Sequence, residues 1–143
     1  SVYFERAIKN PADYFPLSVV VVDIDYFKKI NDNYGHDVGD RVLVKLATLM
    51  KNAIRATDVV SRTGGEEFLI LYPKTTLSMA VKLAEKIRVE IENSPFKEGD
   101  IHHPITASFG VATALTDANI NATIKLADEH LYEAKGAGRN RVM

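Results

Sequence analysis

Two short acidic stretches of this sequence have the composition of a ligand site. The first is Gly64-Gly65-Glu66-Glu67-Phe68, in which two glycines and two carboxylates lie between two apolar runs. Glycine permits positive φ and close approach of a ligand to the backbone, and the glutamates add negative charge, so the stretch suits a metal ion or a polyphosphate. An ordinary solvated hairpin turn has the same composition, so a second acidic cluster has to support the functional interpretation.

The second stretch is Asp23-Ile24-Asp25, directly after the apolar run Leu17 to Val22. Polar residues just past the carboxyl end of a buried strand are where α/β proteins keep their ligand sites. The competing interpretation is that Asp25 only caps a helix starting at Tyr26.

If the two acidic stretches meet, Asp23 and Glu66 repel each other strongly unless a divalent cation lies between them. The sequence has no cysteine, and all-oxygen ligation favours magnesium or manganese over zinc. Such an ion also binds substrate phosphates, which predicts a nucleoside triphosphate as the ligand. The cations available to neutralise the remaining phosphate charge are Lys28, Lys135 and Arg139. The last two would equally suit a helix C-terminus followed by a solvated tail.

A sheet with helices on its faces is expected to position these residues. Leu17 to Val22 predicts a central strand buried on both faces, and Val59 to Arg62 with Phe68 to Tyr72 predicts a hairpin with the glycines at its tip. The residues from Asn31 to Asp40 are dense in turn formers and predict a polar loop, with Asp40 as a possible helix N-cap. The other expected elements are helices at 2–9, 26–30, 40–55 and 77–93, a strand at 104–112 and a helix ending at 136. This order predicts an α/β (α+β) fold with a mixed central sheet of about five strands and helices packed on both faces.

Length and composition indicate one domain spanning 1–143 without a linker. An apolar fraction of 46% and a charged fraction of 26%, with no apolar run of membrane-spanning length, are typical of a cytosolic globular domain. The formal charge of -1 provides no basic field for a nucleic-acid polymer. Because the chain starts at Ser1 without a methionine, we expect it to be excised from a longer regulated protein, with a sensor or regulatory domain upstream.

Four motifs in order resemble those of the GGDEF family of diguanylate cyclases. They are Asp23-Ile24-Asp25-Tyr26-Phe27-Lys28-Lys29-Ile30-Asn31-Asp32 with Tyr34-Gly35-His36 and Gly39-Asp40, then Arg62-x-Gly-Gly-Glu-Glu-Phe, then Ala107-Ser108-Phe109-Gly110-Val111-Ala112, then Ala134-Lys135 with Gly138-Arg139-Asn140. The resemblance covers nearly the whole chain, and glutamate at position 66 is an accepted form of the active signature. The family segment resembling Leu-Thr-Gly-Leu-x-Asn-Arg, which normally precedes the first helix, is not in this sequence.

The resemblance implies a palm-like fold and condensation of two GTP molecules into cyclic di-GMP. It implies that Asp23, the Ile24 carbonyl and Glu66, with Glu67 beside them, hold Mg²⁺ or Mn²⁺, with two ions per active site. The implied catalytic residues are Glu66 as base, Lys28 at the transition state, and Glu67. The implied substrate-binding residues are Phe27, Asn31, His36, Asp40, Gly65, Lys135 and Arg139, with Asn31 and Asp40 recognising guanine.

The resemblance also implies a homodimer, because one subunit holds one GTP and two must face each other. Arg55-Ala-Thr-Asp58 resembles the family's product-inhibition site, with Lys86, and Lys82 near it, as further basic contacts. The same four residues would otherwise be ordinary surface charge at a helix end. Two rival functions stay open: a catalytically inert sensor of GTP or cyclic di-GMP, and a cyclase that forms a mononucleotide ring.

Overall fold

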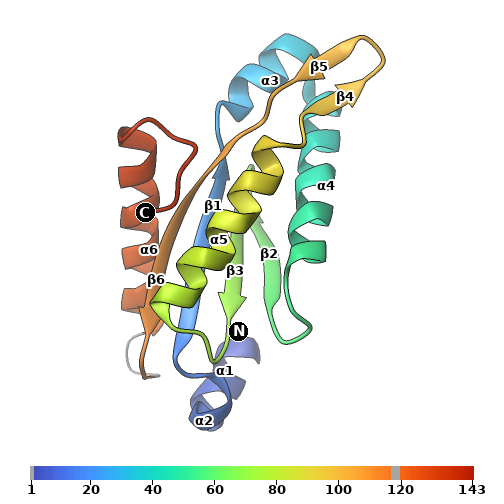
Figure 1. Ribbon diagram of the computed structural model, residues 1–143. Coiled ribbons are helices and arrows are strands. Elements are labelled where there is room, and N and C mark those ends of the chain that lie inside the picture. The colour runs from blue at the N-terminus through green and yellow to red at the C-terminus, as the bar shows by residue number, and fades with distance from the viewer. Residues whose placement is uncertain (1, 117–119) are drawn as a thin grey trace.

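The fold is built on a four-stranded sheet seen in a computed structural model that describes residues 2–116 and 120–143 (Figure 1). Its central strand β1 (Leu17–Ile24) is buried along its whole length, as the run of β-branched residues predicts. β3 (Glu67–Tyr72) and β6 (Ala107–Ala114) pair with β1 on either side, and β2 (Val59–Gly64) pairs with β3 at the edge, giving the order β2-β3-β1-β6. The α+β class and the hairpin that carries the glycines are therefore confirmed.

The strand number and direction differ from the expectation of a mixed sheet of about five strands. All three ladders of the four-stranded sheet are antiparallel. The helical crossovers do connect strands that run in the same direction, from β1 to β2 and from β3 to β6, but another strand lies between the two members of each pair. This split arrangement cannot be read from the order of elements alone. In the described part of the chain, the single parallel pairing is the isolated bridge between Phe109 and Val142.

Helices cover both faces of the sheet, as predicted. On one face, α3 (Phe27–Tyr34), α4 (His36–Ala53) and α5 (Leu77–Glu92) pack against alternate residues of β1 such as Val20 and Val22. On the other face, α1 (Val2–Lys9) and α6 (Ile120–Gly136) pack against the intervening residues, including Val19 and Val21. The period-two alternation of β1 therefore supplies both cores at once.

The predicted polar loop between Asn31 and Asp40 is wrong. α3 continues to Tyr34, the chain turns at Gly35 with φ 91°, and α4 begins at once. Buried apolar side chains such as Ile30 anchor these helices, while the turn-forming residues mostly lie on their exposed sides. As a consequence, Asn31 and Asp40 project from two rigid helices that meet at a tight turn, and Asp40 is inside α4 rather than at its N-cap.

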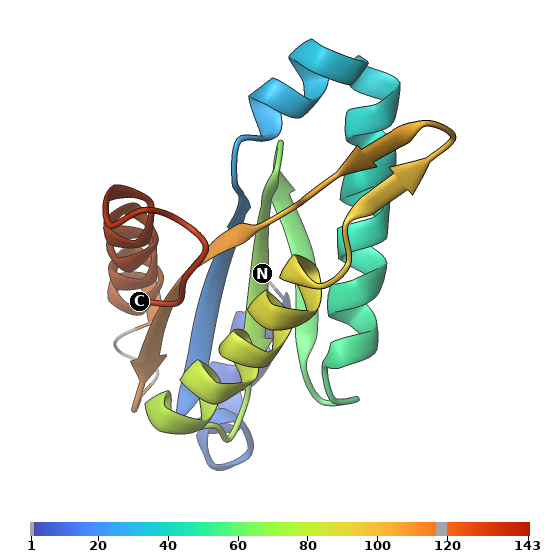
Figure 2. The ribbon, with the colours of Figure 1, turned by 45° about the horizontal axis from the view of Figure 1, so that its top comes forward.

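A second sheet of two short strands, β4 (Phe96–Glu98) and β5 (Ile101–His103), was not predicted, because three-residue strands show no detectable periodicity. Figure 2 shows this hairpin reaching beyond the main sheet toward the first half of α4. Arg41 of α4 holds it with a bidentate pair to Glu98, both N–O distances being 2.6 Å. The remaining element is the short helix α2 (Pro11–Tyr14). Within the described residues, none of the helices has the length and apolar character needed to cross a bilayer.

Candidate active site

The two acidic stretches meet at the carboxyl end of β1. Asp23 is the strand partner of Glu67, and the Ile24 N–H donates to the Glu66 carbonyl at 3.3 Å. A cavity of about 190 Å³ opens there. It is lined by Asp23, Ile24, Asp25, Tyr26, Phe27, Lys28, Glu66, Lys135 and Arg139. The structure thus brings together Asp23 and Glu66, as the sequence predicts.

Asp23 is a buried carboxylate at this cavity. It is 7% exposed, and burial raises the pKa of its carboxyl group, with the charges of Glu66 and Asp25 adding to the effect. An ion pair with Lys135 acts in the opposite direction, lowering the pKa. Because desolvation and like charges both disfavour the ionised form, added positive charge at this point would be bound favourably.

Glu67 does not line the cavity. It is half-buried in β3, and burial raises the pKa of its carboxyl group, with Asp128 and Asp23 contributing. Among the described residues no group of three or more acidic or histidine side chains is close enough to form a metal cage. Asp23, Glu66 and a backbone carbonyl are nevertheless the hard oxygen donors that Mg²⁺ takes when waters and phosphates fill its other positions. The donor set therefore fits magnesium or manganese bound together with a substrate.

All three predicted phosphate-binding cations line the same cavity: Lys28, Lys135 and Arg139. Lys28 lies in the first turn of α3, where backbone N–H groups lack intrahelical partners and favour anions. The turn into α3 places Tyr26 at φ 55°, with its ring 4.7 Å below the Arg139 guanidinium. The contact between Tyr26 and Arg139 could not be predicted from the sequence, because an aromatic residue at a helix start carries no distinguishing pattern.

A second cavity, of about 540 Å³, lies between α4 and β2. It is lined by Asp40, Leu43, Val44, Ala47, Lys51, Val60, Ser61, Arg62 and Phe68. Arg62, which lines this cavity, donates to the Gly65 carbonyl at 2.7 Å across the tip of the β2–β3 hairpin. Apolar walls with a carboxylate at the rim are suited to a planar heterocyclic base.

Asn31 lies beside this region with an unsatisfied polar atom. Its Oδ1 is buried without a hydrogen-bond partner, and it packs so closely on Gly39 that a Cβ there would come within 1.8 Å of it. A buried amide oxygen without a partner is costly, so rotation of this amide toward a ligand donor would be favourable. His36 is exposed at the start of α4 and lines neither cavity.

Gly65 forms the hairpin turn with φ 44°, and space around its Cα is open. The positive φ favours glycine at this position, and the open space around it leaves room for a ligand to approach the hairpin tip. The interpretation of Asp25 as a helix cap is wrong, because α3 begins at Phe27 and Asp25 instead accepts hydrogen bonds from Thr106, Ser108 and Asn140.

The Arg55–Asp58 pair lies at the end of the hairpin opposite to its tip. The Asp58 side chain is fully buried and accepts from the Arg55 backbone at 2.8 Å and from its guanidinium at 2.9 Å twice. Arg55 also donates to Thr75 Oγ1 at 2.7 Å, while its side chain stays 47% exposed. Lys86 is exposed on α5. The structure therefore shows the predicted inhibitory motif as an internally satisfied ion pair.

Comparison with known proteins agrees with this geometry. The family described as "Diguanylate cyclase, GGDEF domain" matches residues 2–141, and the chain belongs to that family. It is 45% identical over 131 residues to the response regulator PleD of Caulobacter vibrioides, covering 90% of this chain and 29% of PleD.

Two solved structures of similar shape extend the comparison. One is the active GGEEF domain of a diguanylate cyclase from Vibrio cholerae, with a TM-score of 0.85, 41% identity and coverage of 99% of this chain and 88% of that one. The other is the GGDEF domain of DgcB from Caulobacter crescentus in complex with c-di-GMP, with a TM-score of 0.85, 30% identity and coverage of 97% and 81%. The chain spans 29% to 39% of the length of the curated relatives it matches.

Proposed function

We propose that this chain condenses two GTP molecules into cyclic di-GMP with release of two pyrophosphates. The observation that carries the proposal is the single cavity in which the carboxylates of Asp23 and Glu66 meet the cations Lys28, Lys135 and Arg139. The same GGEEF motif occurs in a Vibrio cholerae relative described as the active domain of a diguanylate cyclase.

Asp23, the Ile24 carbonyl and Glu66 would hold Mg²⁺ or Mn²⁺, with Glu67 in support from the neighbouring strand position. Two bound ions would supply activation of the attacking 3′-hydroxyl and charge neutralisation at the leaving pyrophosphate. Glu66, which lines the cavity from the hairpin tip, would accept the hydroxyl proton, and the ion pair with Lys135 would offset the negative charge on Asp23.

The triphosphate would lie against the first turn of α3, with Lys28, Lys135 and Arg139 pairing with its oxygens. Lys28 would stabilise the additional charge of the transition state, because phosphoryl transfer depends mainly on positioning and electrostatic stabilisation. Gly65 leaves open space at the hairpin tip for the substrate.

Guanine would bind between α4 and the hairpin. Asp40 would accept from the ring N–H and exocyclic amine, and Asn31 would use its unpartnered Oδ1 and its amide group. Phe27 is buried at the start of α3 with its ring next to Gly39, and it would support this wall. His36 would contribute from the exposed start of α4.

We expect the active form to be a homodimer in which each subunit presents one GTP to the other. An upstream regulatory domain would control that pairing, and the domain would work in the cytosol. Product would inhibit at Arg55, Asp58 and Lys86. Because Asp58 is buried and already fully hydrogen-bonded, product would be held mainly by the exposed edge of Arg55 and by Lys86, which predicts weak inhibition.

Chromatography of a mixture of the protein, GTP and Mg²⁺ tests the proposal. We expect cyclic di-GMP from the wild type, none from Glu66→Gln, and a longer linear phase of product formation from Arg55→Ala. Bound but unchanged GTP would identify a sensor instead, and a cyclic mononucleotide would identify the other class of cyclase.

A further inference from the structure

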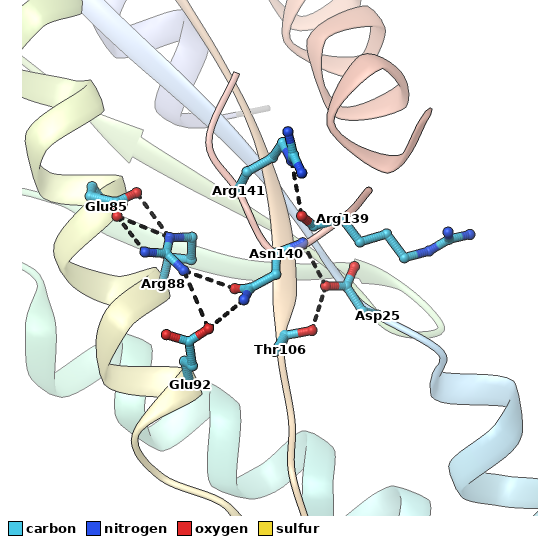
Figure 3. A network of polar contacts seen from close by, with 8 residues as sticks. All are labelled: Asp25, Glu85, Arg88, Glu92, Thr106, Arg139, Asn140 and Arg141. Atoms are coloured by element: carbon cyan, nitrogen blue, oxygen red, sulfur yellow. Dashed lines mark hydrogen bonds and ion pairs between the residues drawn. The ribbon is translucent and has the colours of Figure 1, made fainter. Parts of the chain in front are cut away.

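Asp25 is a buried carboxylate that the proposed chemistry does not use. It is 5% exposed, and it accepts from the Thr106 and Ser108 hydroxyls at 2.7 Å each and from the Asn140 backbone N–H at 3.0 Å (Figure 3). A buried carboxylate is costly unless it is hydrogen-bonded, so Asp25 and these three donors hold one another in place. The hydrogen bond from the Asn140 N–H shows that Asp25 holds the backbone at Asn140.

Asn140 belongs to a turn with an unusual backbone. Gly138, Arg139 and Asn140 have φ values of 119°, 64° and 46°, so two consecutive residues with side chains lie in the left-handed region. Such a conformation persists only where surrounding contacts determine it. The Arg139 N–H donates to the Ala134 carbonyl at 2.9 Å, and the Asn140 N–H donates to Asp25.

The side chain of Asn140 is held from α5. Arg88 donates to its Oδ1 at 2.9 Å, and its Nδ2 donates to Glu92. Arg88 itself is 16% exposed and is fixed by Glu85, to which its Nε donates at 2.9 Å. Both polar atoms of the Asn140 amide are therefore hydrogen-bonded to residues on one face of α5.

The Arg139 side chain points away from this network. Figure 3 shows it extending past Asp25, on the side opposite to Arg88. Its guanidinium lies over the Tyr26 ring and lines the cavity that contains Asp23 and Glu66. The backbone conformation at Arg139 determines where that side chain begins, so contacts to Asn140 can direct Arg139 without touching it.

We propose that Asp25 and Arg88 are positioning residues that hold the 138–140 turn and thereby aim Arg139 at the phosphate pocket. Asp25 acts on the backbone of Asn140, and Arg88 acts on its side chain from α5. This inference rests on the proposed function only in assigning Arg139 to the triphosphate.

Binding of Mg²⁺ with α,β-methylene-GTP, which is not turned over, tests the inference by calorimetry. We expect Arg139→Met to raise the Kd about 10- to 100-fold, as the loss of a charged hydrogen bond to phosphate would. Arg88→Met, which lies outside the cavity, should raise it about 3- to 10-fold. In the Arg139→Met background, Arg88→Met should have no further effect on the Kd, although it should lower the urea midpoint equally in both backgrounds.

A rescue separates positioning from loss of fold. Asn140→Asp keeps an acceptor for Arg88 and tolerates the left-handed conformation, but it places a carboxylate against Glu92 and should weaken binding. Adding Glu92→Gln restores a donor at that point and should recover the wild-type Kd. Arg6→Met, which changes an exposed arginine of α1, is the matched control and should leave the Kd unchanged.

Equal effects of Arg88→Met on the Kd in both backgrounds, or no effect in the wild type, would overturn the inference. An unchanged Kd for Arg139→Met would overturn it too, because the direction of that side chain would then not matter. The proposed function fails on a different result: tight binding of the analogue without cyclic di-GMP formation from GTP.

Discussion

Gly39 lies where α4 approaches Asn31 most closely, and replacing it with alanine tests the proposed guanine site. A Cβ at this position would come within 1.8 Å of Asn31 Oδ1 and 3.2 Å of the Phe27 ring. The first obstacle is the end of a flexible side chain rather than backbone, so Asn31 can rotate away. We expect Gly39→Ala to fold normally and to displace the amide that would read guanine.

The structure allows the stability and binding effects to be estimated separately. Alanine in place of a helical glycine contributes about 0.5–1 kcal/mol, and an off-rotamer Asn31 costs about 0.5–1.5 kcal/mol, so the free energy of unfolding changes by less than about 1 kcal/mol. That change moves the Tm by less than about 4 °C in a domain of this size. Loss of the Asn31 contact with guanine should cost about 1–3 kcal/mol, or about 5- to 150-fold in Kd.

Calorimetry with α,β-methylene-GTP and its inosine counterpart would check this expectation. Inosine lacks the exocyclic amine assigned to Asp40, so the ratio of the two Kd values reports on Asp40 alone. Gly39→Ala should weaken both analogues by the same factor, whereas Asp40→Asn should bring the two Kd values together. An unchanged Kd in Gly39→Ala would refute the assignment of Asn31 to the base.

Three further predictions concern other parts of the molecule. Gly110→Ala should destabilise the protein by more than about 3 kcal/mol in urea unfolding, because its Cβ would lie 2.0 Å from the backbone carbonyl of Ala127, which cannot move aside; a stable variant would contradict this packing. Asp58→Ala should cost about 1–3 kcal/mol by the same measurement, since it removes the hydrogen bonds that the Arg55 backbone N–H and guanidinium donate to this carboxylate, and a neutral effect would show that the pair is dispensable for the fold. Burial raises the pKa of Glu67, so its ionised form opposes folding at neutral pH. Glu67→Gln should therefore be more stable than the wild type at pH 7, and the difference should shrink as the pH falls below the raised pKa and vanish below the ordinary pKa of a glutamate; a gain that persists in acid would show that charge is not its cause.

The sequence predicted best where one local pattern determines the outcome. The short β-branched run in β1 favours a strand buried on two faces, and the glycines at the hairpin tip favour a turn there. Because β1 and β3 are neighbours, the tip necessarily comes to the end of β1, and Asp23 and Glu66 meet.

The predictions from the sequence failed where contacts between residues far apart in the chain determine the structure. The turn-forming residues after Ile30 favour a loop locally, but Gly35 makes the turn and packing on the sheet keeps the rest helical. The sheet is antiparallel because β3 lies between β1 and β2, and β1 lies between β3 and β6. No local sequence pattern predicts this strand order. The partners of Asp25 are more than 80 residues away, so a helix cap was the nearest available interpretation.

Asp23 and Asp25 show how two carboxylates two positions apart in the sequence take different roles. Asp23 is still part of β1, and its side chain lies on the α6 face beside Lys135, where burial raises its pKa and leaves charge for a cation to balance. Asp25 follows the last strand residue, leaves the pleat and reaches the start of β6 and the 138–140 turn, where three donors satisfy it. Because β1 ends at Ile24, between the two residues, Asp23 is suited to bind an ion and Asp25 is suited to hold the backbone. A substitution at Asp23 should therefore affect metal dependence, whereas one at Asp25 should affect the direction of Arg139.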